Sequence, residues 1–88
     1  MKIDYKDWKV KVEQNLLIVE KLGEMREYDL PEWKTAEHNM EYIYITLPDD
    51  SLIQFKMEID DFLVGDKFDS EGEHIDTLAC HVFGEEID

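Results

Sequence analysis

The clearest pattern in the chain is a two-residue alternation of apolar and polar positions between residues 42 and 59. In YIYITL (42–47) every second residue is isoleucine or leucine, and these side chains share one face. In LIQFKMEI (52–59) the apolar face carries Ile53, Phe55, Met57 and Ile59. The intervening PDDS has the composition of a tight turn. The pattern therefore predicts two half-buried antiparallel strands joined by a short connection.

The first part of the chain follows a different period, and residues 4–22 are predicted to form an amphipathic helix. Asp4 suits the start of such a helix and Gly23 its end. A β-hairpin remains an alternative for this region. WKVKVE alternates, LLIV is a short apolar run, and Val10 and Leu17 lie off the helical stripe. The helical stripe consists of residues at three- and four-residue intervals: Tyr5, Trp8, Val12, Leu16, Val19 and Leu22.

Residues 24–40 lack a sustained period and are predicted to be a connector. Pro31 is suited to the first turn of a helix, so PEWKTAEH is expected to form one or two helical turns that end at Asn39.

Residues 60–83 are predicted to continue the sheet. FLVGDKF forms a strand in which Gly65 marks a bulge or bend, and DSEGE forms a turn. IDTLACHVF is the last strand, with Leu78, Cys80 and Val82 on one face, which makes Cys80 a small core residue. The predicted fold is α+β: one N-terminal amphipathic helix packed on a three- or four-stranded antiparallel sheet. The chain is a single domain of residues 1–88, with 85–88 a frayed acidic tail.

Charge changes this picture, because the chain carries 9 basic and 23 acidic residues, a formal net charge of −14. Residues 1–44 hold seven basic and ten acidic residues, whereas residues 45–88 hold two and thirteen. Such a charge repels nucleic acid and anionic membranes and attracts basic proteins. Direct binding to nucleic acid or a membrane is therefore not expected.

The single cysteine, Cys80, excludes an intrachain disulfide and fits a reducing compartment. The N-terminus, MKIDYKDWKVK, has no uninterrupted apolar run and does not look like a signal peptide. A cytoplasmic location is expected, which would be the host cytoplasm if a phage encodes the chain.

Metal and catalytic chemistry are poorly supported. Five acidic residues lie between Asp66 and Asp76, but DSEGE lacks the D-x-[DN]-x-[DN]-G order of a calcium loop. Cys80 and His81 are adjacent, so strand geometry would turn them to opposite faces. No Gly-rich phosphate loop is present. No metal, cofactor or catalytic residue is predicted, and the chain is expected not to be an enzyme.

The acidic segment 58–76 instead suggests a binding surface. Carboxylates two residues apart on a strand lie about 6.6 Å from each other, a spacing broadly like that of a phosphate backbone. Tyr42 and Tyr44 share the face opposite the isoleucines, where they are either an exposed anchor or packed beneath another element. The predicted partner-binding residues are Tyr42, Tyr44, Glu58, Asp60, Asp61, Asp66, Asp69, Glu71, Glu73 and Asp76.

The leading hypothesis is a non-enzymatic inhibitor that occupies the basic site of a nucleic-acid-binding protein such as a nuclease. Small acidic nucleic-acid mimics that phages encode against host defence systems share this size and charge. The analogy is with this general class of proteins and not with a particular family. Two alternatives stay open. The first is an immunity protein or antitoxin that neutralises a basic toxin, and the second is a small phage structural or assembly protein. The sequence leaves the oligomeric state undetermined.

Overall fold

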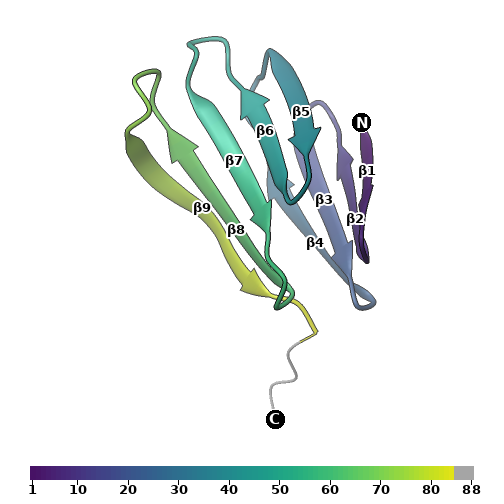
Figure 1. The fold of residues 1–88 in the computed structure, drawn as a ribbon. Helices are drawn as coiled ribbons and strands as arrows, with labels where there is room; N and C mark the ends of the chain where they lie inside the picture. The colour runs from purple at the N-terminus through teal and green to yellow at the C-terminus, as the bar shows by residue number, and fades with distance from the viewer. Residues whose placement is uncertain (85–88) are drawn as a thin grey trace.

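The structure, a computed structural model, describes residues 1–84 and is built from strands within that range. Sheet A has four antiparallel strands in the order β1-β2-β3-β4, and sheet B has five in the order β5-β6-β7-β8-β9. Each strand therefore pairs with its neighbour in sequence (Figure 1). The strands are β1 (Lys2–Tyr5), β2 (Trp8–Val12), β3 (Leu16–Lys21), β4 (Glu24–Asp29), β5 (Thr35–Asn39), β6 (Tyr42–Thr46), β7 (Leu52–Met57), β8 (Phe62–Phe68) and β9 (His74–Val82).

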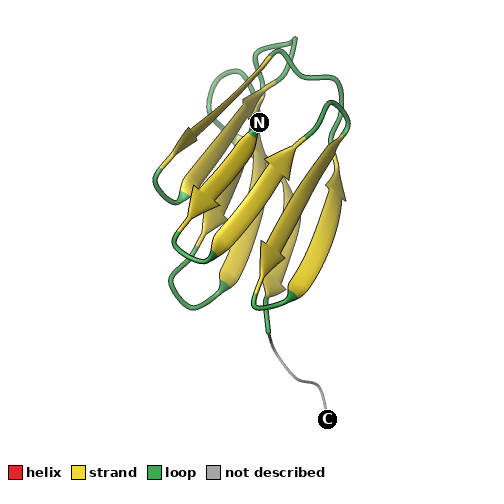
Figure 2. Ribbon diagram, turned by 90° about the vertical axis from the view of Figure 1, so that its right-hand side faces the viewer, coloured by secondary structure: helices red, strands yellow, loops and turns green. Residues whose placement is uncertain are grey.

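The two sheets pack face to face as a sandwich (Figure 2). Each sheet turns its apolar side chains inward, and these form one core to which both sheets contribute. Tyr28 of β4 packs against Phe55 of β7 with ring centroids 5.7 Å apart, and Trp8 of β2 packs against Phe83 at 5.4 Å. These aromatic contacts tie the sheets together across the layer between them.

A short crossing segment, residues 30–34, carries the chain from sheet A to sheet B. Its backbone is held at both ends, since Leu30 N donates to Asn15 O and Lys34 N donates to Thr46 O. Trp33 Nε1 also donates to Glu13 O at 3.3 Å. These bonds join the connector to the end of each sheet.

The prediction of an N-terminal helix, and with it the α+β fold class, is wrong. Residues 2–21 form three antiparallel strands, so the hairpin alternative describes this region. The two positions that the helical stripe excluded, Val10 and Leu17, are buried, whereas Leu22 is 59% exposed. WKVKV forms a strand and not a helix because its alternation turns every apolar side chain of β2 toward the facing sheet. The connector prediction is also wrong, since residues 24–40 contain β4 and β5.

The strands predicted at 42–47, 52–59, 62–68 and 75–83 are present as β6, β7, β8 and β9, although β6 ends at Thr46, β7 at Met57 and β9 at Val82. A register shift beside Gly65 confirms the irregularity predicted there. Asp49 Oδ1 accepts a bond from Ser51 N, which closes the predicted PDDS turn. Two details are wrong. Ile59 lies in a turn and is 94% exposed. Cys80 is exposed, because a bulge at Leu78 reverses the alternation and buries Ala79 in its place.

Candidate partner-binding surface

The predicted acidic residues do not form one continuous face, because β8 separates them into two groups. Residues 58–61 form the turn between β7 and β8, which we call the lower turn. Residues 69–73 form the turn between β8 and β9, the upper turn (Figure 1). β8 has seven residues, so the two groups lie roughly 23 Å apart at about 3.3 Å per residue.

The upper turn is shaped by one of its own carboxylates. Asp69 Oδ1 accepts bonds from Glu71 N and from Glu73 N, both at 2.9 Å. Gly72, at φ 86°, provides the left-handed position that the tight turn needs. Asp69 therefore has a structural role, and it leaves the side chains of Glu71 and Glu73 exposed to solvent.

The lower turn is attached to sheet A by an ion pair. Lys21 Nζ lies 3.2 Å from Asp61 Oδ1, and its side chain is only 8% exposed. The same ammonium lies 5.2 Å from the centre of the Trp8 ring. Lys21 is thus a buried cation held by a carboxylate and an aromatic face. Asp61 is committed to this pair, whereas its neighbour Asp60 is exposed.

Glu58 and Asp66 also have partners within the fold. Lys56 lies 3.4 Å from Glu58, and this contact raises the pKa of the Lys56 ammonium. Asp66 Oδ1 contacts His74 Nε2 at 2.9 Å and Thr77 Oγ1 at 3.4 Å on the outer face of sheet B.

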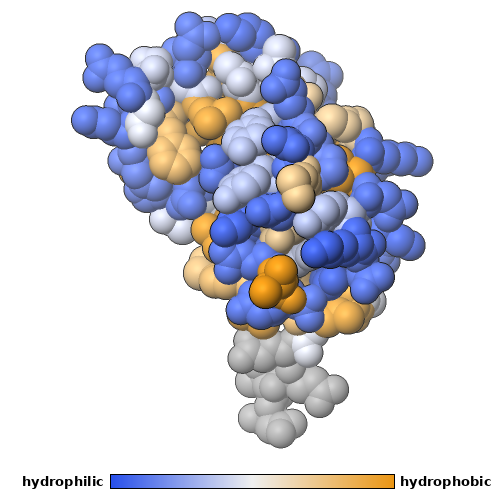
Figure 3. Space-filling model, in the orientation of Figure 1, coloured by the Kyte–Doolittle hydropathy of each residue, from blue (hydrophilic) through white to orange (hydrophobic). Residues whose placement is uncertain are grey.

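Tyr42 and Tyr44 lie on this same outer face, stacked on one another with ring centroids 5.8 Å apart. Both are half-buried, and Lys56 lies over the Tyr42 ring. Cross-strand register places Tyr44 and Asp66 on either side of Gln54. Figure 3 shows that this side of the molecule is mostly hydrophilic, with apolar side chains in separate groups. The tyrosines therefore form a half-buried stacked pair on the outer face, between the two acidic turns.

Asp76 lies apart from the other predicted residues. It pairs in register with Lys67, whose strand position faces the inner side of sheet B, so Asp76 and Asp66 point to opposite faces. Of the eight predicted carboxylates, four have no ion pair or hydrogen bond through their side chains to residues 1–84. These four carboxylates are Asp60, Glu71, Glu73 and Asp76.

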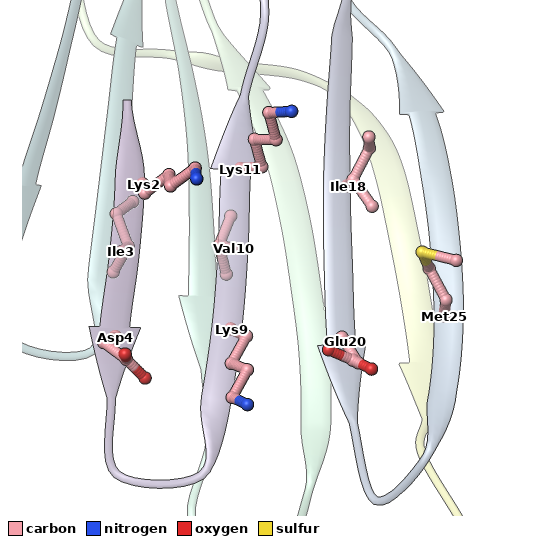
Figure 4. Close-up of a pocket in the computed structure, with 9 residues that line it drawn as sticks. All are labelled: Lys2, Ile3, Asp4, Lys9, Val10, Lys11, Ile18, Glu20 and Met25. Carbon is pink, nitrogen blue, oxygen red and sulfur yellow. The ribbon is translucent and has the colours of Figure 1, made fainter.

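The outer face of sheet A carries charges of both signs. A shallow groove of about 350 Å³ lies across β1–β4, and its charged lining consists of Lys2, Lys9 and Lys11 together with Asp4 and Glu20 (Figure 4). Lys2 and Lys11 are directly opposite each other in the β1–β2 register. The groove thus holds three of the nine basic residues, and the register of sheet A places Lys9 between Asp4 and Glu20.

A second polar contact between the sheets was not foreseen from the sequence. His81 Nε2 donates to Glu24 Oε2, and Gly84 N donates to Glu24 Oε1 at 3.3 Å. The bond from His81 holds the pKa of the Glu24 carboxyl below its usual value of 4.5. The two residues are 57 positions apart, so no local pattern could have paired them.

This contact predicts a pH-dependent difference between the wild type and Glu24→Gln. A carboxyl with a lowered pKa stabilises the fold fully above its ordinary pKa, and that contribution is lost as the pH falls through the folded value. We expect Glu24→Gln to be less stable than the wild type at pH 7, and the gap to close toward pH 3. Urea midpoints of both chains across this range measure it. A gap that stays constant with pH would contradict the pairing.

The fold keeps apart the other residues that were considered for metal binding or catalysis. Cys80 and His81 lie on opposite faces of β9, as adjacent strand residues must. Among residues 1–84 no group of three or more metal-binding side chains is gathered. The same range contains no helix with the length and apolarity that spanning a bilayer requires.

Exposed carboxylates at both ends of β8, with a tyrosine pair between them, are the arrangement most open to a partner. Comparison of the chain with protein families, with curated proteins and with solved structures finds no match.

Proposed function

We propose that the chain is a non-enzymatic acidic binding protein that inhibits a nucleic-acid-binding protein by occupying its basic site. The observation that carries the proposal is the placement of exposed carboxylates in two turns at opposite ends of β8. The separation of roughly 23 Å is comparable with about seven nucleotides along one strand at about 3.4 Å each. A groove lined with Lys and Arg along that length would meet negative charge at both ends.

The tyrosine pair would provide the contact area at the centre of this binding surface. Tyrosine contributes a large rigid contact area at low entropic cost and is enriched where proteins bind one another. Tyr42 and Tyr44 are stacked and half-buried, so they are ordered before a partner arrives. In this proposal they make contacts at the centre, and Asp60, Glu71 and Glu73 steer the approach.

The distribution of charge along the chain would orient an approaching basic partner. Residues 45–84, which include β7, β8 and β9, hold ten acidic and two basic residues. In this proposal a basic partner is drawn toward the acidic turns at the two ends of β8. Exposed charges are screened over about 10 Å at 0.1 M salt, so association should weaken steeply as salt rises.

Identification of the partner is the first test. The tagged chain would be used to capture proteins from the native host lysate, with washes at low and at high salt, followed by mass spectrometry. We expect one stoichiometric, salt-sensitive partner with a basic nucleic-acid groove. A small secreted toxin as the partner would favour an immunity protein instead, and recovery of no basic protein would contradict the proposal.

Charge reversal then tests the surface itself. The triple variant Asp60→Lys, Glu71→Lys and Glu73→Lys should associate about tenfold or more slowly than the wild type in stopped-flow or surface-binding kinetics. These three side chains have no partner within residues 1–84, so urea unfolding should show no loss of stability.

The matched control reverses three exposed acidic residues elsewhere, as Asp7→Lys, Glu27→Lys and Asp29→Lys. It changes the net charge by the same amount but leaves both acidic turns intact. If the two triple variants slow association equally, net charge alone acts and the proposed surface is wrong.

A further inference from the structure

Sheet B ends in two edge strands, β5 and β9, and β9 is the longest strand among residues 1–84, with nine residues. Its first five residues, 74–78, are all exposed, and Ala79 is the one buried residue of the strand. Figure 1 shows β9 as the outermost strand of sheet B, with no strand of sheet A behind its upper half. A strand that is ordered without cover on either face or along one edge is a template for pairing with another chain.

The exposed side chains of β9 are unusually apolar for an unprotected edge. Ile75 is 54% exposed, Leu78 38% and Val82 39%. These are three of the eight large hydrophobic residues that are exposed in residues 1–84. In a chain of net charge −14, such a concentration on one strand favours contact with another protein surface.

We propose that β9 pairs antiparallel with β9 of a second copy, so that two sandwiches share a ten-stranded sheet. The two-fold axis of such a dimer stands perpendicular to the sheet, which makes the inner face of one copy continuous with the inner face of the other. Residues directly opposite each other must therefore lie on the same face. This rule selects the register.

The bulge at Leu78 decides which register obeys the rule. Asp76 and His81 both take inner-face positions, whereas Thr77 and Cys80 both take outer-face positions. Faces match across this stretch when Asp76 lies opposite the partner's His81 and Thr77 opposite the partner's Cys80. A shift by one residue in either direction would place inner positions against outer ones. The bulge, which often protects an edge, here aligns the two strands.

Chemistry favours the same register. Between residues 76 and 81, Asp76 lies opposite the partner's His81 and Leu78 lies opposite the partner's Ala79. A second register shift, at Ile75, ends the regular stretch there. No two carboxylates face each other within this stretch. The contact of Leu78 with Ala79 around the two-fold axis, the matching faces and the absence of facing carboxylates favour a second copy as the occupant.

Cysteine cross-linking tests the register directly. Opposite residues of an antiparallel pair have Cα atoms about 4.5–5.5 Å apart, within the range of a disulfide. Thr77→Cys should therefore form a covalent dimer, in which the thiol introduced in one copy joins the native Cys80 of the other under mild oxidation. A mixture of ¹⁴N- and ¹⁵N-labelled chains should give a mixed-isotope peptide in mass spectrometry, with its disulfide between position 77 and position 80.

Three controls make the cross-link specific. The wild type, with Cys80 alone, and the double variant Thr77→Cys/Cys80→Ala, with the introduced thiol alone, should stay monomeric on a non-reducing gel. Thr35→Cys places the same new thiol on β5, the exposed edge at the other side of sheet B. Covalent dimers of Thr35→Cys at the yield of Thr77→Cys would overturn the proposal.

Sedimentation velocity of the untagged wild type tests the dimer without cross-linking. Two copies of charge −14 repel each other, so raising salt should strengthen the dimer, the reverse of what is expected for binding to a basic partner. Leu78→Lys places two like charges at the two-fold axis and should weaken association about tenfold or more, with an unchanged urea midpoint. A wild type that stays monomeric at several hundred micromolar protein in about 0.5 M salt would overturn the proposal. Since no other protein is present, this result is independent of the proposed function.

Discussion

Replacing Leu17 by alanine is expected to lower the free energy of unfolding by about 2–5 kcal/mol, as for other large-to-small changes in a core. Leu17 is completely buried, between Val12 of β2 and Tyr28 of β4 in the register of sheet A. Its side chain fills part of the single core that both sheets share. Removing three carbon atoms there leaves a cavity in the core. Equilibrium urea unfolding followed by tryptophan fluorescence measures the loss.

Leu22 is the matched control, because the helical interpretation and the sandwich assign opposite roles to these two leucines. Leu22 is 59% exposed, and Leu22 and Gly23 have φ of 53° and 77°, as a two-residue hairpin turn requires. Leu22→Asn creates the preferred Asn-Gly turn and should leave stability unchanged or raise it by up to about 1 kcal/mol. A large loss for Leu22→Asn with a small loss for Leu17→Ala would contradict the sandwich.

The wrong helix has a physical cause that these residues make plain. Trp8, Val12 and Val19 are buried in the sandwich, and their intervals of four and seven also fit a helix. Val10 and Leu17 distinguish the strands from the helix. A period of two residues explains why both are buried, whereas a period of 3.6 residues does not. Short strands joined by two-residue turns give few repeats of either period, so the strongest local pattern did not identify the fold.

The acidic surface shows a similar limit. The sequence predicted that residues 58–76 hold exposed carboxylates, and Asp60, Glu71 and Glu73 are exposed in turns. The pairs Lys21–Asp61 and Glu24–His81 join residues 40 and 57 positions apart, and they depend on how the sheets face each other. The prediction that the last strand is regular likewise placed Cys80 in the core instead of Ala79. The bulge that exchanges their positions cannot be recognised from the alternation of apolar and polar residues.

Phe55→Ala is expected to produce the largest loss of stability, about 3–5 kcal/mol. The Phe55 side chain is 1% exposed, its ring packs against Tyr28 of sheet A, and it also covers Gly65 on the neighbouring strand. Truncation removes contacts within sheet B and between the sheets together. Since a small domain has roughly 5–15 kcal/mol of stability, Phe55→Leu provides a milder variant that should remain folded. Urea midpoints of both variants should fall, that of Phe55→Ala further.

Gly65 makes this prediction specific to the observed packing. A Cβ atom at Gly65 would lie 2.6 Å from Phe55 Cε1 and 3.1 Å from Ala79 Cβ, so Gly65→Ala in the wild type should cost about 1–3 kcal/mol through overpacking. In the Phe55→Ala or Phe55→Leu background the ring is absent, and the same change should cost little or restore part of the lost stability. The double-mutant cycle should therefore give a coupling of about 1–3 kcal/mol. Additive effects would mean that the Phe55 ring does not cover Gly65, and that the apolar faces of β7 and β8 are packed differently from the sandwich described above.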